Sequence, residues 1–316
     1  MSGKESSSSP HLVADGILLG VSVFWGTSFA IVKEALEVAS PANFLFIRFS
    51  MACLILLPAA WARRRSWSKQ LLWPGAWVGF FLFGAFFTQA WGLVYTSASR
   101  SGFITGLSVI LVPLFSIILL RQMPGWSAML GAGVAFFGLY LLASGDQAQG
   151  LPFNLGDMLT LVCAVFWAGH ILALGRYSPG ADTFWLTFIQ LLTAGIGSFT
   201  GAGLSGTLSL ALPGKVYGAA LYLAIACTIL AYLGQTWAQA RTTPTRTAII
   251  LTMEPVFAAL FAWWWLGERL GLWGWVGAGL ILGGILSAEL KPHGGVRPAP
   301  SAQIKGRVIK RRVLHP

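Results

Sequence analysis

Five polar side chains lie inside long apolar stretches of this sequence: Arg48, Gln89, His170, Gln235 and Glu254. Charges and amides are costly in such surroundings and usually mark a function. A guanidinium, an imidazole, a carboxylate and two amides can bind the polar groups of a small solute, and the acid and the histidine can also exchange protons. The apolar stretches contain neither paired acids nor a cluster of metal ligands. This set therefore predicts solute binding without a catalytic residue, a metal or a cofactor.

Glu254 precedes Pro255 near the middle of its stretch, and two roles are open for it. A charge at that depth costs about 2.5 to 3.5 kcal/mol on insertion scales, so we expect Glu254 to be paired or protonated. In a structural role, a protonated Glu254 donates to the carbonyl of Leu251, which Pro255 leaves without its helical partner. In a functional role, its protonation is coupled to substrate movement. The candidate partners on other helices are Arg48 and His170.

Arg48 and His170 also have two roles each. Arg48 pairs with an acid or extends toward the membrane surface, which are structural roles, or it binds a substrate carboxylate. His170 binds substrate, or it is a neutral histidine that bonds to a backbone carbonyl. Pro113 and Pro255 are candidate hinges, because proline removes a helical hydrogen bond.

Two tryptophans, Trp25 and Trp167, are candidate substrate contacts deep in the membrane. Each lies about twelve residues into its apolar stretch, which places both rings near mid-depth. A buried indole offers a flat face and an N–H donor, so the pair either lines a cavity or packs tightly against small neighbours.

Two further pairs of candidate substrate contacts lie near opposite ends of their stretches: Gln89 with Trp91, and Gln235 with Trp237. For the tryptophans, the aromatic belt at the membrane interface is the competing explanation. The glutamines are expected to face the protein interior, because an amide that faces lipid is unsatisfied.

The composition excludes a water-soluble fold. Of the 316 residues, 56% are apolar and only 10% are charged, against roughly 25% charged in a soluble domain. A net charge of +11 would suggest nucleic acid in a soluble protein, but Lys and Arg avoid the apolar stretches here, which favours a membrane surface. The three cysteines, Cys53, Cys163 and Cys227, all lie in apolar stretches and are expected to be packing residues.

Ten stretches are long enough to span a bilayer. The hydrocarbon core is about 30 Å thick, so a spanning helix needs about 20 mostly apolar residues. The ten cover residues 12–33, 41–61, 71–96, 99–121, 125–144, 156–175, 182–203, 215–237, 243–265 and 270–290. The sequence therefore predicts an all-α membrane protein with ten transmembrane helices.

The basic residues set the expected orientation, because Lys and Arg accumulate on the cytoplasmic side. With the N-terminus inside, fifteen of them fall in inner segments and four in outer ones. We therefore expect a plasma membrane protein, in bacteria an inner membrane protein, with cytoplasmic tails at 1–11 and 291–316. The second tail has seven basic residues and no acid, so it is expected to be disordered or to lie partly on anionic lipid.

Short motifs recur in the same order in the two halves of the chain. FWG at 24–26 is echoed by FWA at 166–168, 142 residues later. QAW at 89–91 with Arg100 is echoed by QTW at 235–237 with Arg246, 146 residues later, and PLF at 113–115 by PVF at 255–257, 142 residues later. Each half holds five spans, so the second half must enter the membrane in the opposite orientation. We expect inverted five-helix repeats at 12–144 and 156–290 joined by a linker at 145–155, an architecture typical of secondary transporters.

Glycines four residues apart permit close approach of membrane helices. Such pairs occur at Gly16 and Gly20, Gly75 and Gly79, Gly102 and Gly106, and Gly279 and Gly283. We expect them to pack against neighbouring helices.

Residues 251–260 read LTMEPVFAAL and are followed by WLGE at 265–268, while the first half has FWG at 24–26 and Arg48-Phe49. These motifs resemble the EamA family of the drug/metabolite transporter superfamily. The resemblance implies ten helices in two inverted units and the export of small metabolites, often amino acids. One branch, the YddG-type exporters, handles aromatic amino acids.

These features predict a secondary transporter that exports small amphipathic metabolites by alternating access, with aromatic or other apolar amino acids as the leading class. Export of other small metabolites or drugs is the main alternative. An integral membrane enzyme fits less well, because the spans lack clustered catalytic groups. A channel also fits less well, because the sequence contains no repeated polar filter segment. The expected partners are a small-molecule substrate and the lipid bilayer, with no nucleic acid. The sequence leaves the substrate, the transport direction, the coupling ion and the oligomeric state open.

Overall fold

The computed structural model describes residues 9–96, 98–121, 123–144, 153–266 and 271–289. These residues form helices and connecting turns and contain no strand. Seven helices in this part are long and apolar enough to cross a membrane, and shorter apolar helices occur at Trp126–Leu142 and Leu272–Ala288. The expectation of an all-α membrane protein is confirmed. The basic tail at 291–316 and most of the linker at 145–155 lie outside the described residues.

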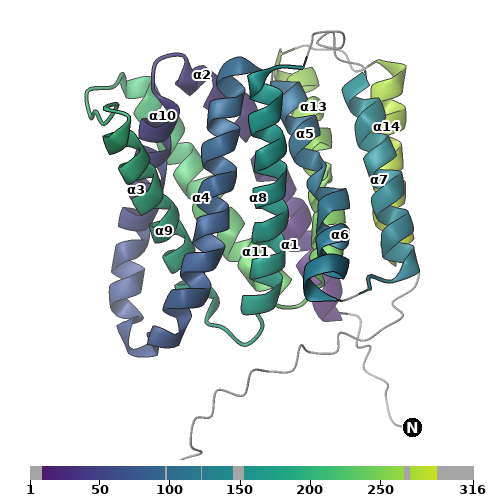
Figure 1. The fold of residues 1–316 in the computed structure, drawn as a ribbon, viewed down its shortest axis with the longest axis horizontal. Coiled ribbons are helices and arrows are strands. Elements are labelled where there is room, and N and C mark those ends of the chain that lie inside the picture. Colours follow the sequence, from purple (N-terminus) through teal and green to yellow (C-terminus); the bar gives the residue numbers. More distant parts are fainter. Residues whose placement is uncertain (1–8, 97, 122, 145–152, 267–270, 290–316) are drawn as a thin grey trace, which may run out of the picture.

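The helices run up and down one elongated bundle (Figure 1). In chain order they are α1 Ser9–Gly26, α2 Ser28–Leu36, α3 Pro41–Ala62, α4 Leu72–Tyr95, α5 Ala98–Gly106, α6 Ser108–Leu120, α7 Trp126–Ser144, α8 Leu155–Tyr177, α9 Thr183–Leu204, α10 Gly214–Ala224, α11 Ala231–Gln239, α12 Pro244–Leu251, α13 Met253–Leu266 and α14 Leu272–Glu289. Two 3-10 turns, Arg64–Ser66 and Lys69–Leu71, connect α3 to α4, and a π-helix at Ile225–Leu230 joins α10 to α11.

Polar side chains fix where several helices begin. Asn154 and Asp157 form a capping box at the start of α8, and Asp182 accepts hydrogen bonds from two backbone N–H groups of α9. Thr243 caps α12 ahead of Pro244 at its first position. These caps satisfy N–H groups that have no partner within the helix.

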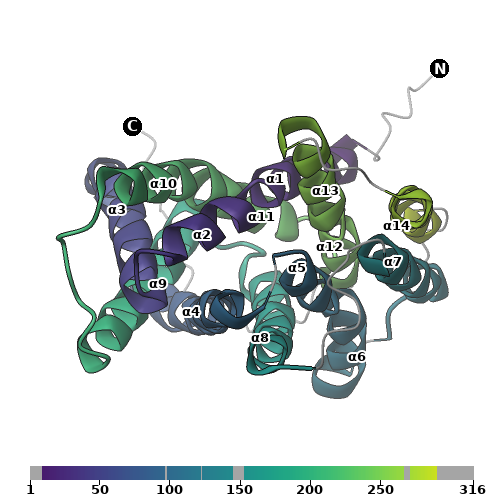
Figure 2. The same ribbon diagram turned by 90° about the horizontal axis from the view of Figure 1, so that it is seen from above.

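Helices from the two halves of the chain are interleaved. The first helix, α1, packs against α11, α12 and α13, and α8 packs against α4, α5 and α6. Seen from above, α7 and α14 lie together at one side of the bundle, and α3, α9 and α10 lie at the other (Figure 2). Most of the packing that holds this bundle together therefore lies between the halves.

The α7–α14 contact depends on glycines seven residues apart. A Cβ on Gly138 would lie 2.6 Å from the carbonyl oxygen of Gly277, and one on Gly131 would lie 2.6 Å from that of Gly284. Gly131 and Gly138 are two helical turns apart on α7, as Gly277 and Gly284 are on α14. All four glycines therefore lie along one line of contact and bring the two backbones together.

The predicted close packing of the glycine pairs is confirmed at some positions and wrong at others. Gly75 and Gly79 pack tightly against α9 as predicted, and Gly106 packs against Leu139. The prediction was wrong for Gly16, Gly20, Gly279 and Gly283, which have no neighbouring atom within 4 Å of a built Cβ. In lipid-facing helices a four-residue spacing does not show which face meets another helix.

Candidate functional site

Three helix interruptions meet at one cavity. The span formed by α1 and α2 is interrupted at Thr27, that of α5 and α6 at Leu107, and that of α12 and α13 at Thr252. Hydroxyl groups stabilise two of these breaks: Thr27 Oγ1 donates to the carbonyl of Phe24, and Thr252 Oγ1 donates to that of Ile249. Such side chains compete with the helical backbone for its carbonyls.

Residues from these interruptions line the cavity together with two from α8. The lining residues are Trp25, Phe29, Gly102, Thr105, Gly106, Ser108, Trp167, Ile171, Leu251, Thr252, Glu254 and Pro255. We call this cavity 1. Its free volume is about 30 Å³, which admits about two water molecules. It is therefore too small to hold an amino acid in this conformation.

Glu254 is the only acid on the wall of cavity 1, and it has no hydrogen bond or ion pair with any residue that the structure describes. Neither predicted partner reaches it: Arg48 binds Thr228 and Cys227, and His170 binds Gln190. The expected bond to the Leu251 carbonyl is also not formed. The helix break at Thr252 falls three residues before Pro255, one of the two candidate hinges.

Arg48 is held by an irregularity in helix α10–α11. Its Nε donates to Thr228 Oγ1 at 2.9 Å, and its Nη2 donates to the Cys227 carbonyl at 3.3 Å. The same carbonyl accepts a hydrogen bond of 3.0 Å from Trp25 Nε1. Both acceptors belong to the π-helix, a rare local form that often marks functional sites. The guanidinium carbon also lies 4.6 Å from the centre of the Phe86 ring.

Arg48 and Gln89 line a second small cavity, cavity 2, whose other walls come from α2, α3 and α4. Within the described ranges, Arg48 has no acidic partner. Phe29 belongs to the wall of both cavities, and Gln89 Nε2 donates to Thr105 Oγ1 of cavity 1 at 3.3 Å. The two cavities therefore adjoin, with Arg48 on one and Glu254 on the other, and neither side chain has a partner of opposite charge among the described residues.

Aromatic rings surround this pair of cavities. The ring centres of Trp25 and Trp167 are 5.4 Å apart, and Trp25 lies 5.5 Å from Tyr232. His170 lies behind them, with its ring edge-on to Trp167 and Tyr232. It lines neither cavity, and its Nε2 is 2.9 Å from Gln190 Oε1.

The remaining candidates line neither cavity. Trp91 packs near Phe87, and Arg241 covers the Trp237 ring at 3.8 Å. The Gln235 side chain is buried and has no hydrogen-bond partner among the described residues. Pro113 lies inside α6, which stays helical there, and the nearest break is six residues earlier.

Sequence reasoning missed Phe29, Thr105, Thr228 and Tyr232. Phe29 follows Trp25 by one helical turn, which was a usable signal. The π-helix that brings Thr228 and Tyr232 toward Arg48 has no recognised sequence pattern in this chain.

The site can hold a cation near Glu254, an anion near Arg48 and an apolar group against the rings. The described residues contain no group of three or more His, Cys, Asp or Glu side chains placed to hold a metal ion. These groups can bind a small solute non-covalently.

The chain is similar to several membrane transporters. It is 34% identical over 257 residues to an uncharacterized transporter of Archaeoglobus fulgidus, covering 80% of this chain and 78% of that protein. It is 26% identical to the uncharacterized transporter YyaM of Bacillus subtilis, covering 88% and 94% of the two chains. A crystal structure of a protein with 22% identity shares the fold, with a TM-score of 0.72 over 90% of this chain and 98% of the other.

The EamA-like transporter family matches twice along the sequence, at residues 12–144 and 154–288. The two matches cover most of the chain, and the curated relatives are transporters by name. The chain therefore belongs to the EamA-like transporter family and is an integral membrane protein of the transporter class.

Proposed function

We propose that this transporter exports small amphipathic amino acids, foremost aromatic ones, by alternating access of two inverted five-helix repeats. The observation that carries the proposal is the placement of Glu254 and Arg48 on adjoining cavities, each without a partner of opposite charge in the described part of the chain.

A zwitterion suits this arrangement better than an anion or a cation. Its ammonium group would compensate Glu254 and its carboxylate would compensate Arg48, so that both charges are paired only when substrate is bound. Charge-assisted hydrogen bonds are about twice as strong as neutral ones. Binding energy is then gained from groups that every amino acid carries.

The aromatic walls favour a large apolar side chain on the substrate. Trp25, Phe29 and Trp167 present rings to cavity 1, and Ile171 and Leu251 add aliphatic surface. Aromatic pairs contribute roughly 0.5 to 1.5 kcal/mol beyond the burial of their area. A sugar or a nucleotide would leave its many hydroxyl or phosphate groups unsatisfied against such walls.

Three features support alternating access. Helices broken near their middle line the cavities, as in secondary transporters. The first helix of each half packs against the fourth span of the other half, α1 against α12 and α13, and α8 against α5 and α6. The two cavities have free volumes of about 30 and 20 Å³, room for about one or two waters each, so substrate enters after the halves move. The cytoplasmic position of both termini is supported by the distribution of Lys and Arg, and the outward direction by the family resemblance.

Ligand-induced thermal stabilisation of the purified transporter tests the proposed substrate class. Tryptophan should stabilise more than tryptamine, which lacks the carboxylate, or indole-3-propionate, which lacks the ammonium group. A ligand at about ten times its Kd adds about 1.4 kcal/mol, a shift of a few degrees in Tm. Equal shifts from all three compounds, or shifts from glucose or adenosine alone, would contradict the proposal.

A further inference from the structure

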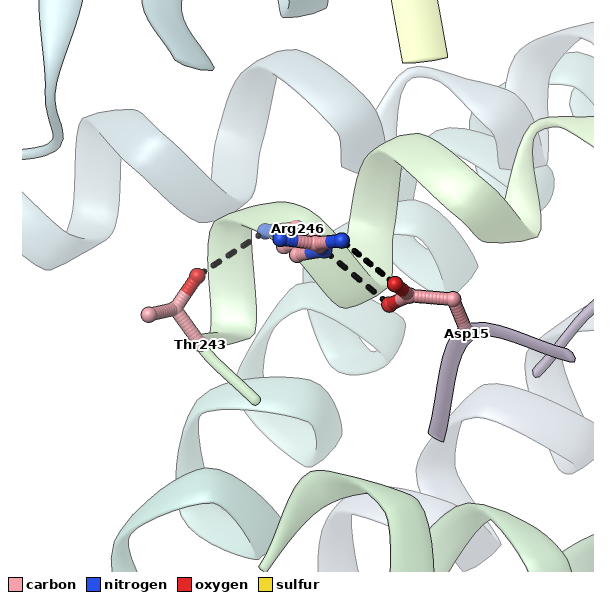
Figure 3. Close-up of polar contacts among 3 residues, drawn as sticks. All are labelled: Asp15, Thr243 and Arg246. Atoms are coloured by element: carbon pink, nitrogen blue, oxygen red, sulfur yellow. Dashed lines mark hydrogen bonds and ion pairs between the residues drawn. The ribbon is translucent and has the colours of Figure 1, made fainter. Parts of the chain in front are cut away.

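An ion pair ties the two halves of the chain together at one end of the bundle (Figure 3). Arg246 Nε of α12 donates to Asp15 Oδ1 of α1 at 3.0 Å, and Arg246 Nη2 donates to Asp15 Oδ2. Thr243 Oγ1 accepts from the backbone N–H of Arg246 at 3.2 Å and so fixes the start of α12. The Asp15 side chain is only 9% exposed and that of Arg246 22%. This is a bidentate, largely buried contact, the stronger kind of ion pair.

The pair lies between cavity 1 and that end of the bundle. Arg246 is the third residue of α12, and Glu254 follows it by eight residues on the same helix line, about 12 Å along the axis. While the pair is formed, α1 and α12 cannot separate below the cavity. The ion pair thus holds α1 against α12 on this side of cavity 1.

The repeat places a second acid and a second base at the other end. Asp157 follows Asp15 by 142 residues, as Trp167 follows Trp25, and Arg246 follows Arg100 by 146 residues, as Gln235 follows Gln89. Arg100 is the third residue of α5, as Arg246 is the third of α12.

The elements that carry this second pair lie next to each other. Helix α8 packs against α5, and both begin at the end of the bundle opposite to the start of α1 (Figure 1). Asp157 is the third residue of α8. It accepts hydrogen bonds from Thr96 Oγ1 at 2.9 Å and from the backbone N–H of Asn154 at 3.0 Å.

We infer that Asp15–Arg246 is a latch of the transport cycle that closes one exit of the substrate path, and that Asp157, its counterpart in the repeat, holds the latch at the other exit. The inference rests on the proposed alternating access. Asp15–Arg246 joins the first helix of one half to the fourth span of the other, so opening that exit requires the acid and the base to separate. Asp157 joins the first helix of the second half to Thr96 at the end of α4. The sequence symmetry makes the two latches equivalent, and each shifts the population toward the state that keeps its own exit closed.

Thiol labelling from each side of the membrane tests the latches. The three native cysteines are replaced by alanine, and Ser108→Cys on the wall of cavity 1 reports access of an impermeant maleimide. Asp15→Asn should raise the labelling rate by about tenfold from the side on which α1 begins. Asp157→Asn should raise it by a similar factor from the opposite side.

Two further variants separate a latch from a loss of folding. Asp182→Asn removes an aspartate that caps α9 without joining the halves, and it should leave both labelling rates unchanged. The exchange of charges in Asp15→Arg with Arg246→Asp should return labelling to the unsubstituted rate. If Asp15→Asn does not fold, this exchanged variant carries the test.

The inference is overturned if the two asparagine variants open the same side. It is also overturned if the folded charge-exchanged protein keeps the raised labelling rate of Asp15→Asn. The thermal-shift panel is read separately on the same preparations. Side-specific labelling without stabilisation by tryptophan would leave the latches standing and would reject the proposed substrate.

Discussion

Replacing the acid of cavity 1 by its amide, Glu254→Gln, should weaken substrate binding without weakening the fold. The amide has nearly the same shape, but it has no charge to attract an ammonium group. In the described part of the chain Glu254 has no hydrogen bond or ion pair to lose. Binding should therefore weaken while the stability of the fold is kept or increased, as at many functional sites.

The magnitudes follow from that lack of a partner. A hydrogen bond to a charged group contributes about 1.5 to 3 kcal/mol, so the Kd for tryptophan should rise roughly 10- to 150-fold. A charged Glu254 near the middle of the membrane costs about 2.5 to 3.5 kcal/mol. The substitution removes that cost if the unpaired acid is charged without substrate, and changes little if it is protonated. The Tm without substrate should therefore stay level or rise.

The assay compares three ligands on purified wild-type and variant protein. Tryptophan and tryptamine carry the ammonium group and should both bind more weakly to Glu254→Gln, whereas indole-3-propionate should be little affected. The matched control is Glu34→Gln, because Glu34 is exposed and lies 3.9 Å from Lys215 in a surface pair. Such pairs contribute little, so the control should bind all three ligands normally.

Two results would refute this reasoning. If Glu254→Gln bound tryptophan normally, Glu254 would not contact the ammonium group. If the variant lost several degrees of Tm, Glu254 would have a structural partner. The pH profile of tryptophan exchange adds a separate reading: a profile unchanged by the substitution would exclude Glu254 as the group that couples protons to transport.

Four other changes have definite expected outcomes. Arg48→Gln should lower both Tm and tryptophan affinity, since it loses two hydrogen bonds and the contact with Phe86; indole-3-propionate binding should fall and tryptamine binding should not. Gly138→Leu should lower the free energy of unfolding by about 1 to 3 kcal/mol or more, because the new side chain would overlap α14. Gly279→Leu, with open space around it, should leave the Tm unchanged. Trp25→Phe should lower Tm by the value of one hydrogen bond, about 0.5 to 1.5 kcal/mol, and a melt that matches wild type would show that the bond to the π-helix is unimportant. Removal of residues 292–316 should leave tryptophan flux intact, and loss of flux in an inserted protein would make the tail part of the transport path.

Hydrophobicity alone placed most helices within a few residues. The stretches expected at 41–61 and 71–96 are Pro41–Ala62 and Leu72–Tyr95 in the structure. A span must satisfy its whole backbone internally, so an apolar run of about 20 residues has few alternatives to a helix.

The helix breaks were harder to predict. Proline pointed to the neighbourhood of Pro255, but the break in α5–α6 lies at Leu107 rather than at Pro113. Tightly packed neighbours decide whether a helix with Gly, Ser and Thr stays continuous. That packing is a property of the assembled bundle.

The sequence predicted which residues line the candidate site, but it did not predict which groups those residues contact. Trp25, Trp167 and Glu254 do line one cavity, and Arg48 lines the next. Arg48 was one of two candidate partners for Glu254, but it does not pair with it, because a π-helix supplies a carbonyl and a hydroxyl to the guanidinium. Which faces of which helices meet depends on their rotation, and a uniformly apolar helix does not encode its rotation in its hydrophobic pattern.

Counterflow in liposomes tests the central claim most directly. Vesicles that contain the wild-type transporter and excess unlabelled tryptophan are diluted into labelled tryptophan. Alternating access predicts transient accumulation of label that saturates with concentration, is competed by phenylalanine but not by glucose, and is strongly reduced by Glu254→Gln. Uptake that rises linearly with concentration, or exchange of sugars in place of amino acids, would contradict the account.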